Sequence, residues 1–237
     1  IKHLTESGLM PKEEMLEVRK SERNLFIGIP KETALQENRV ALVPDSVGLL
    51  VNNGHRVIIE SNAGEAANFT DKDYSEAGAE IVSESKEVYK ANIIIKVAPP
   101  TLDEIELLNA TQKQVLFSAL QISSQPKDCI KELMKKKVTG IAYDFIKDRE
   151  GVYPIVRSMS EIAGNTSILI AAELLSNANG GHGVMMGGIP GVKPTEVIIL
   201  GSGGVGEFAA RAALGLGANI KLFDDESHKL RRTLNNL

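Results

Sequence analysis

The sequence predicts an α/β fold with mostly parallel sheets, arranged in two domains. From residue 25 onward, short apolar runs alternate with helix-like segments, which is typical of parallel strands joined by helical connections. Near residue 196 another apolar run leads directly into a glycine-rich turn and a further helix-like segment. The length of 237 residues allows one to two domains, at roughly 150 residues per domain.

The first domain is predicted to span residues 25–150, after a polar N-terminal extension of residues 1–24. The extension is expected to contain a short charged helix, because Pro11 suits a first helical position and basic residues come late. In the domain itself, each apolar run is a predicted strand and the segments between runs are predicted helices. The expected strands are Leu25–Ile29, Val57–Glu60, Ile93–Val97, Val115–Ala119 and Val138–Ala142. The expected helices are Ser46–Asn53, Asp71–Ala77, Ser85–Ala91, Leu102–Leu108 and Lys127–Lys137.

The second domain, residues 151–237, is predicted to begin with a long helix and to continue with a strand, a turn and a second helix. The long helix is expected over Met159–Asn177, starting at or near Ser160 and ending at the glycines that follow Asn179. Residues 183–193 are rich in glycine and proline and are expected to form a loop. The strands of this domain are expected at Glu196–Leu200 and Ile220–Phe223.

The turn after the strand at Glu196–Leu200 has the glycine spacing of a dinucleotide-binding loop. Gly201 allows the tight turn, Gly203 lets a pyrophosphate approach the backbone, and Gly206 permits close packing of helix and strand. The helix that starts near Val205 presents free N–H groups and the positive end of its dipole to phosphates. A glycine-rich turn without a ligand is the alternative interpretation. The residues expected to contact the cofactor here are Gly201, Gly203, Gly204, Val205 and Gly206.

An acidic residue follows the next strand, about 20 residues after the turn, as in a Rossmann-like nucleotide domain. Asp224 is expected to accept hydrogen bonds from the adenosine ribose hydroxyls and to repel a 2′-phosphate, which favours NAD over NADP. Asp225 and Glu226 add negative charge beside Asp224, which strengthens the preference for NAD. The alternative interpretation is that they simply lie in a solvated turn. A complete domain of this kind has about six strands, and only about 36 residues follow Gly201. The expected fold class is therefore α/β with two Rossmann-like domains, the second truncated at its C-terminus.

Composition and charge argue against several functions. A net charge of −4 and a pI near 5.7 argue against nucleic-acid binding, and no run reaches the ~18 apolar residues of a membrane helix. The single cysteine, Cys129, excludes an intrachain disulfide and favours a cytoplasmic protein. The first residue is Ile1, so the start of the chain is expected to be missing or removed. No metal site is predicted, because ligand spacing is lacking among the four histidines His3, His55, His182 and His228.

Several further motifs occur in a fixed order along the chain. The first are Gly28-Ile29-Pro30-Lys31-Glu32 and Glu37-Asn38-Arg39-Val40-Ala41, followed by Pro44, Val47 and Gly54-His55. They continue with Met159–Gly164, the loop Met186–Val192 and the glycine turn up to Asp224. Together, over about residues 25–237, they resemble the alanine dehydrogenase and pyridine nucleotide transhydrogenase family. The Met-Gly-Gly-x-Pro-Gly loop is similar to the alanine dehydrogenase branch.

The resemblance implies an NAD-dependent oxidation of L-alanine to pyruvate and ammonia, with hydride transfer that forms NADH. It also implies a cofactor held between the two domains, a small amino-acid or 2-oxo-acid substrate, and a homo-oligomer, either a hexamer or a dimer. Arg39 matches the arginine that binds the substrate carboxylate through two parallel hydrogen bonds. The alternative interpretation of Arg39 is a surface ion pair with Glu32 or Glu37. Met159 and Ser160 match residues beside the nicotinamide, with helix packing and an N-cap as the alternatives.

Two positions depart from the pattern of the family's dehydrogenases. The substrate-holding lysine expected two residues after Lys96 is Ala98, and the acid–base histidine after the next strand is Gln121. Glutamine donates and accepts hydrogen bonds but takes no proton at pH 7. Lys96 shares a strand face with position 98 and is long enough to lean toward the pocket; alternatively its stem lies along the domain edge. The predicted catalytic residues are Arg39, Lys96 and Gln121.

Two functions follow from these matches and departures. The first, which the loop and helix motifs favour, is an NAD-dependent alanine dehydrogenase with altered site chemistry. The second is an NAD-binding relative that does not oxidise alanine, either a transhydrogenase-type subunit or a non-catalytic regulatory or structural protein. The substitutions at Ala98 and Gln121 favour this second function.

Overall fold

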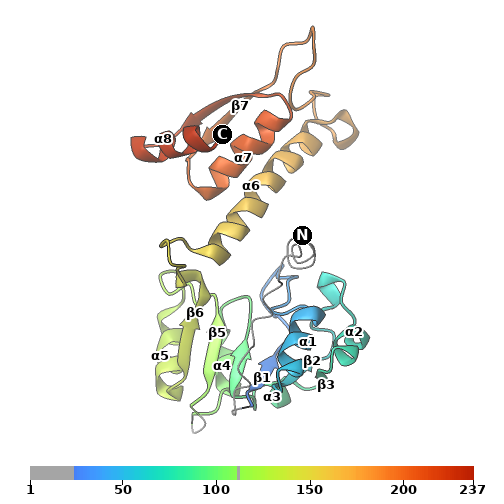
Figure 1. Cartoon of the computed structure of the whole chain (residues 1–237), viewed down its shortest axis with the longest axis vertical. Helices are drawn as coiled ribbons and strands as arrows, with labels where there is room; N and C mark the ends of the chain where they lie inside the picture. The colour runs from blue at the N-terminus through green and yellow to red at the C-terminus, as the bar shows by residue number, and fades with distance from the viewer. Residues whose placement is uncertain (1–23, 111–112) are drawn as a thin grey trace, which may run out of the picture. The chain divides into compact units, whose positions relative to one another are not determined.

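The computed structural model describes residues 24–110 and 113–237 (Figure 1). The helix predicted in the N-terminal extension lies outside these residues. The chain divides after Ala142 into two compact units, the second of which begins at Tyr143. Within the described residues, no helix has both the length and the apolar character needed to cross a membrane.

The first unit is built on a six-stranded sheet. Its strands are β1 (Phe26–Ile29), β2 (Arg56–Glu60), β3 (Glu80–Val82), β4 (Ile93–Ile95), β5 (Val115–Ser118) and β6 (Thr139–Ala142). They lie in the order β3-β2-β1-β4-β5-β6, and each neighbouring pair is parallel. The predicted parallel sheet is therefore confirmed, with one strand, β3, that the sequence analysis did not predict.

Helices connect these strands and cover both faces of the sheet. They are α1 (Pro44–Asn52), α2 (Asp71–Glu76), α3 (Ser85–Val88), α4 (Leu102–Leu107) and α5 (Lys127–Lys136), with a 3₁₀ turn, η1, at Glu65–Ala67. Successive residues of β2 point to opposite faces, as the strand geometry requires. Val57 and Ile59 pack in one core cluster with Val47, whereas Ile58 packs in the other with Tyr89.

Several predicted bounds in the first unit differ from the structure by one to three residues, and one strand, β3, was not predicted. The apolar run of strand β3 is only Ile81-Val82, which is too short to stand out in the sequence. Helix α1 begins at Pro44 rather than at Ser46, because the fixed φ of proline suits the first helical position. Helix α3 ends at Val88 rather than at Ala91.

The order of the strands places a candidate ligand site at the ends of β1 and β4. The chain moves outward from β1 through β2 to β3 and then returns to the other side of β1 with β4. In open α/β sheets, ligands bind outside the carboxyl ends of the strands at such a reversal. The loops that follow Ile29 and Ile95 therefore form the part of the first unit where a substrate is expected.

The second unit contains a single βαβ unit preceded by a long helix. Its elements are η2 (Tyr143–Phe145), α6 (Pro154–Leu175), η3 (Asn177–Asn179), β7 (Glu196–Leu200), α7 (Gly204–Gly215), β8 (Asn219–Phe223) and α8 (Ser227–Asn236). Strands β7 and β8 pair in parallel, with Val197 opposite Ile220. Ile168 of α6 packs with Ala209 and Ala213 of α7 against the inner side of these strands. The predicted strand–turn–helix–strand order is confirmed.

The start of helix α6 corrects a prediction. The helix begins at Pro154, ahead of the predicted start at Met159, because proline favours the first helical position. Ser160 lies within the helix and is not its N-cap; its Oγ donates a hydrogen bond to the carbonyl oxygen of Val156 at 2.9 Å. The predicted start at Met159 is therefore wrong, and the signal for the true start is Pro154.

Candidate functional site

The glycine-rich turn between β7 and α7 leaves its backbone open. Gly201 has a φ of +99°, in the left-handed region that favours glycine. A Cβ on Gly206 would lie 1.9 Å from the carbonyl oxygen of Gly201, so a side chain there would prevent the close packing of α7. A Cβ on Gly203 would meet no atom within 4 Å. Helix α7 has no side-chain cap at its N-terminus, so its first turn presents backbone N–H groups and the positive end of its dipole.

A groove beside this turn collects most of the predicted cofactor residues. It has a volume of about 560 Å³. Ser160 of α6 lies close to the turn, since a Cβ on Gly204 would be 3.0 Å from the Ser160 Cβ. Met159 is not among the lining residues, and 39% of it is exposed. The predicted residues that line the groove are Ser160, Gly201, Gly203, Gly204, Val205 and Gly206.

Asp224 follows β8 and folds back onto the same turn. Its Oδ2 accepts hydrogen bonds from the backbone N–H of Ser202 at 2.6 Å and from the Ser202 hydroxyl at 2.8 Å. Its Oδ1 accepts the N–H of Glu226 at 2.9 Å. The backbone hydrogen bonds from Ser202 and Glu226, with the Ser202 hydroxyl, hold the pKa of Asp224 well below its usual range. An anionic Asp224 beside an open glycine turn fits the ribose and pyrophosphate of a dinucleotide.

Ser202 is a part of this site that the sequence analysis missed. The residue is fully buried. Its carbonyl oxygen accepts hydrogen bonds from Thr233 Oγ1 and from Nη2 of Arg232, both at 3.3 Å, which ties the turn to α8. The sequence does contain a signal for this contact. Ser202 lies between the first two glycines of the turn, and the acidic Asp224 follows the next strand, β8.

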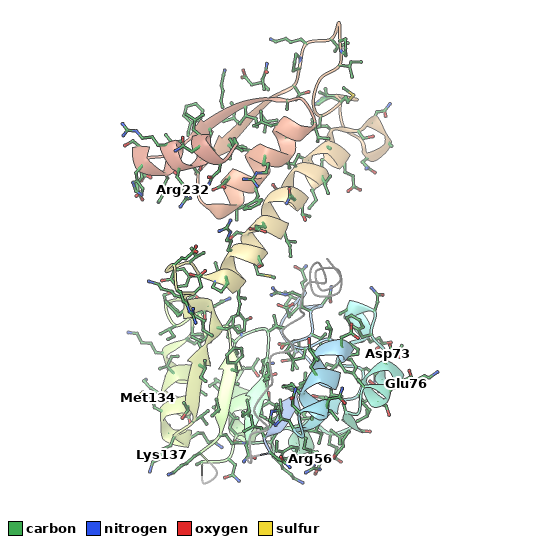
Figure 2. All side chains as sticks on the ribbon, in the orientation of Figure 1. Arg56, Asp73, Glu76, Met134, Lys137 and Arg232 are labelled. Atoms are coloured by element: carbon green, nitrogen blue, oxygen red, sulfur yellow. The ribbon has the colours of Figure 1, made fainter. Side chains whose placement is uncertain are left out.

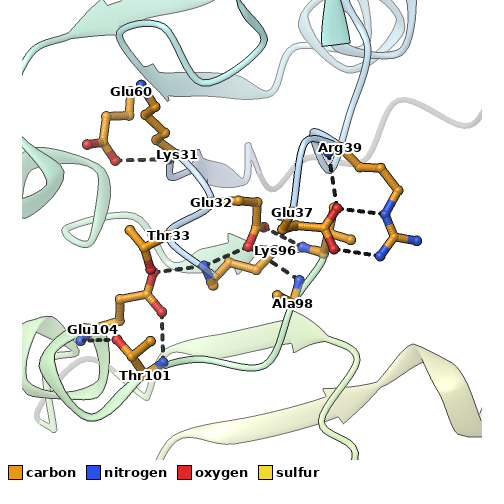
Figure 3. Close-up of polar contacts among 11 residues, drawn as sticks. Lys31, Glu32, Thr33, Glu37, Arg39, Glu60, Lys96, Ala98, Thr101 and Glu104 are labelled. Carbon is orange, nitrogen blue, oxygen red and sulfur yellow. Dashed lines mark hydrogen bonds and ion pairs between the residues drawn. The ribbon is translucent and has the colours of Figure 1, made fainter. Parts of the chain in front are cut away.

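Arg39 lies in the loop between β1 and α1, where it forms a two-pronged ion pair with Glu37 (Figure 3). Its Nε donates to Oε1 at 2.7 Å, and its Nη2 donates to Oε2 at 2.6 Å. The hydrogen bonds from Arg39 hold the pKa of Glu37 below its ordinary value. The ion pair with Glu37, which the sequence analysis gave as an alternative, is therefore present in the structure.

Lys96 is buried directly after β4, between two carboxylates (Figure 3). Its Nζ lies 3.0 Å from Glu32 Oε2 and 2.8 Å from Glu104 Oε1. Glu32 also accepts the backbone N–H groups of Val97 at 2.6 Å and Ala98 at 3.3 Å. The loop after β1 and the turn after β4 are thus joined by one network of charged hydrogen bonds.

The two positions that depart from the expected family pattern follow β4 and β5. Ala98 is buried, with 8% of its surface exposed. Gln121 is exposed and has a φ of +42°, a left-handed conformation that is uncommon for residues other than glycine. Its carbonyl oxygen accepts the N–H groups of Ser124 at 2.9 Å and Gln125 at 3.1 Å, which stabilises this turn.

The comparison with known protein families covers almost the whole described chain. Residues 28–163 match the N-terminal domain described as "Alanine dehydrogenase/PNT", and residues 167–236 match the corresponding C-terminal domain. The chain belongs to the alanine dehydrogenase/PNT family. This match includes the segments of Arg39 and Lys96 as well as the glycine turn, and it confirms the resemblance inferred from the ordered motifs.

The sequence is also similar to individual proteins named alanine dehydrogenase. The chain is 44% identical over 207 residues to an alanine dehydrogenase of Methanococcus maripaludis, covering 87% of this chain and 55% of that protein. It is 40% identical over 209 residues to an alanine dehydrogenase of Mycolicibacterium smegmatis, covering 88% and 56%. The chain therefore spans about half the length of the curated relatives it matches.

Two solved structures share the fold. An L-alanine dehydrogenase superimposes with a TM-score of 0.80 at 40% identity, covering 89% of this chain and 58% of that chain. A transhydrogenase from Sinorhizobium meliloti superimposes with a TM-score of 0.72 at 23% identity, covering 88% and 59%. The second likeness shows the fold alone.

Proposed function

We propose that the protein is an NAD-dependent L-alanine dehydrogenase that converts L-alanine, NAD⁺ and water to pyruvate, ammonia (as NH₄⁺), NADH and a proton. The observation that carries the proposal is the turn after β7, where open glycine backbone and the anionic Asp224 lie together. Relatives named alanine dehydrogenase, at 40% and 44% identity, support the choice of substrate.

The residues of the second unit would hold the cofactor. The backbone of the glycine turn and the first N–H groups of α7 would bind the pyrophosphate, and Asp224 would accept hydrogen bonds from the adenosine ribose and repel a 2′-phosphate. Ser160, which lines the same groove, would lie against the cofactor, and Met159 stays a prediction for the nicotinamide side. When bound, NAD supplies the acceptor for the hydride that leaves the substrate.

The residues of the first unit would hold the substrate. Arg39 would bind its carboxylate through parallel N–H groups and so orient the Cα hydrogen. Gln121 would hydrogen-bond to the amino or keto group without exchanging a proton. Lys96 stays a predicted substrate contact; its Nζ is held by Glu32 and Glu104 and would reach a substrate only by leaving one of these carboxylates.

The test separates oxidation of alanine from binding of NAD. Formation of NADH from L-alanine by the purified protein is followed by absorbance, and affinity for NAD is measured by calorimetry. We expect turnover in the wild-type protein and loss of NAD affinity in Asp224→Ala. NAD binding without turnover would instead support the non-oxidising relative that the Ala98 and Gln121 substitutions favour.

The proposed function includes assembly into a homo-oligomer, a hexamer or a dimer. This part of the proposal rests on the family resemblance. Light scattering coupled to gel filtration measures the molar mass, and a single species with the mass of one chain would contradict it.

A further inference from the structure

Glu37 and Arg39 form a more ordered unit than an ordinary surface ion pair. The carboxylate and the guanidinium meet as parallel forks, at 2.7 and 2.6 Å (Figure 3). The backbone N–H of Arg39 donates to the same carboxylate at 3.1 Å. The Glu37 side chain is only 12% exposed, whereas that of Arg39 is 55% exposed. A largely buried carboxylate thus fixes both the plane of an exposed guanidinium and the turn that carries it.

We propose that Glu37 is a positioning residue, which holds the guanidinium of Arg39 in the orientation that receives a substrate carboxylate. The inference rests on the role proposed above for Arg39. Glu37 acts through Arg39 and is not itself a catalytic residue, because its carboxylate would repel the carboxylate of the substrate.

The benefit to binding is entropic and geometric. An arginine side chain has many rotamers, and part of this conformational entropy is lost when a ligand orders the side chain. Glu37 accepts hydrogen bonds from Nε and Nη2 of the guanidinium, and all N–H donors of this group lie in one plane. Since Glu37 already orders this plane, a carboxylate that binds to Arg39 is placed reproducibly, and with it the Cα hydrogen that must face the cofactor.

The surroundings keep Glu37 in place and charged. The loop that carries it is joined to the turn after β4, because Glu32 accepts hydrogen bonds from Lys96 Nζ at 3.0 Å and from the N–H of Val97 at 2.6 Å. The hydrogen bonds from Arg39, and to a smaller extent the charge of Lys96, hold the pKa of Glu37 below its ordinary value. Glu37 is therefore an anion at neutral pH, as a partner for a guanidinium must be.

The test variant is Glu37→Gln, which keeps the size of the side chain and removes its charge. The chain offers a matched control in Glu80→Gln, because Arg56 and Glu80 form the same forked pair at 2.7 and 2.7 Å. That pair is exposed, at 55% and 50%, and Arg56 lies at the amino end of β2, away from the loops at the carboxyl ends of the strands (Figure 2).

The first readout is independent of activity. In protein with isotope-labelled arginine, the Nε–H resonance of Arg39 is assigned by its absence from Arg39→Lys. We expect this resonance to exchange slowly with solvent in the wild-type protein, to broaden or vanish in Glu37→Gln, and to persist in Glu80→Gln. An unchanged resonance in Glu37→Gln would overturn the proposal.

The second readout is the split between KM and kcat. We expect Glu37→Gln to raise the KM for L-alanine by about tenfold to a hundredfold with a smaller change in kcat, since the guanidinium must then be ordered at the binding step. Glu37→Asp, which keeps the charge on a shorter stem, should lie between wild type and Glu37→Gln. Glu80→Gln should keep both wild-type constants. An unchanged KM in Glu37→Gln would also overturn the proposal.

Failure of the proposed function can be told apart from failure of this inference. If the wild-type protein forms no NADH from L-alanine, the proposed activity is wrong, and pyruvate is then titrated by calorimetry as a carboxylate probe. The wild-type protein should bind pyruvate more tightly than Glu37→Gln by about tenfold or more. Equal affinities, including no binding to either protein, would overturn the positioning role.

Discussion

Lys96 shows how a single buried charge is stabilised in this fold. Its side chain is 1% exposed, and its ammonium lies 3.0 Å from Glu32 and 2.8 Å from Glu104. Each carboxylate has a further donor, the N–H of Val97 for Glu32 and the hydroxyl of Thr33 for Glu104. A buried ion pair is tolerated when such hydrogen bonds satisfy the remaining oxygen lone pairs.

The variant Lys96→Met should therefore lower the free energy of unfolding by about 3–5 kcal/mol, because two carboxylates would stay buried without their counter-charge. The control is Lys90→Met: Lys90 is 62% exposed beside Glu87, and such exposed pairs contribute about 0–1 kcal/mol. Urea denaturation measures both proteins. An equal loss of unfolding free energy in the two variants would contradict a buried ion-pair network at Lys96. A Lys96→Met protein that folds and still oxidises alanine would exclude a substrate contact by Lys96.

Asp224 makes stability depend on pH. Hydrogen bonds from the backbone of Ser202 and Glu226 lower its pKa in the folded protein. A carboxyl whose pKa is lower in the folded than in the unfolded chain stabilises the fold above the unfolded-state pKa of about 4, and this contribution is lost as the pH falls through the folded-state value. Asp224→Asn should thus lower the Tm at neutral pH, and its difference from wild type should shrink below about pH 4. Thermal unfolding at several pH values checks this; a difference that is constant with pH would contradict it.

At the scale of elements, the close approach of α6 and α7 depends on Gly164. A Cβ at this position would lie 2.5 Å from the carbonyl oxygen of Val205 and 2.7 Å from the Cβ of Phe208. Gly215, the last residue of α7, is the opposite case, since a Cβ there would meet no atom within 4 Å. Substitution of Gly164 therefore tests the packing of the two helices, whereas substitution of Gly215 tests helix propensity alone.

We expect Gly164→Ala to destabilise the protein by about 1–3 kcal/mol, because the added methyl group must push the two helices apart. Gly215→Ala should leave the stability unchanged or raise it by up to about 1 kcal/mol, since alanine is the better helix former. Chemical denaturation followed by circular dichroism measures both. A stabilised Gly164→Ala protein would mean that α6 and α7 do not pack this closely in solution.

Local sequence signals were sufficient to predict most helices and strands. They failed where the apolar run was short or where the start signal lay outside the segment considered. Runs of four or five residues predicted every strand except β3, which has only two apolar residues in a row. The start of α6 was missed because Pro154 stands ahead of the segment from which the helix was inferred. Boundaries were thus less predictable than the existence and order of the elements, which follow from periodicity over longer windows.

At the scale of the whole molecule, predictability depended on how far apart in the sequence the partners lie. The glycine turn and Asp224 belong to one βαβ unit with a fixed spacing, so the sequence placed them together. Glu37 and Arg39 are two residues apart, and their ion pair was foreseen as an alternative. By contrast, Lys96 meets Glu32 across 64 residues. No periodic pattern connects those positions, and only the folded sheet brings them together.

Binding of NAD should be measurable as a change in the stability of the molecule. A ligand that binds only the folded chain stabilises it by about 2.7 kcal/mol at 100 times its Kd. Gly203 has a φ of −68° and open space where a Cβ would lie, so alanine fits there in the free protein. Its methyl group would nevertheless occupy the approach of a pyrophosphate.

Gly203→Ala should consequently keep the wild-type Tm without ligand and lose most of the rise in Tm that saturating NAD gives to the wild-type protein. Gly206→Ala should instead lower the Tm without any ligand, because its Cβ would lie 1.9 Å from the carbonyl oxygen of Gly201. NADP should raise the wild-type Tm less than NAD does, since its 2′-phosphate meets the anionic Asp224. If Gly203→Ala gained as much from NAD as the wild-type protein, the dinucleotide would have to bind away from this turn, and the alanine dehydrogenase proposal would lose the observation that carries it.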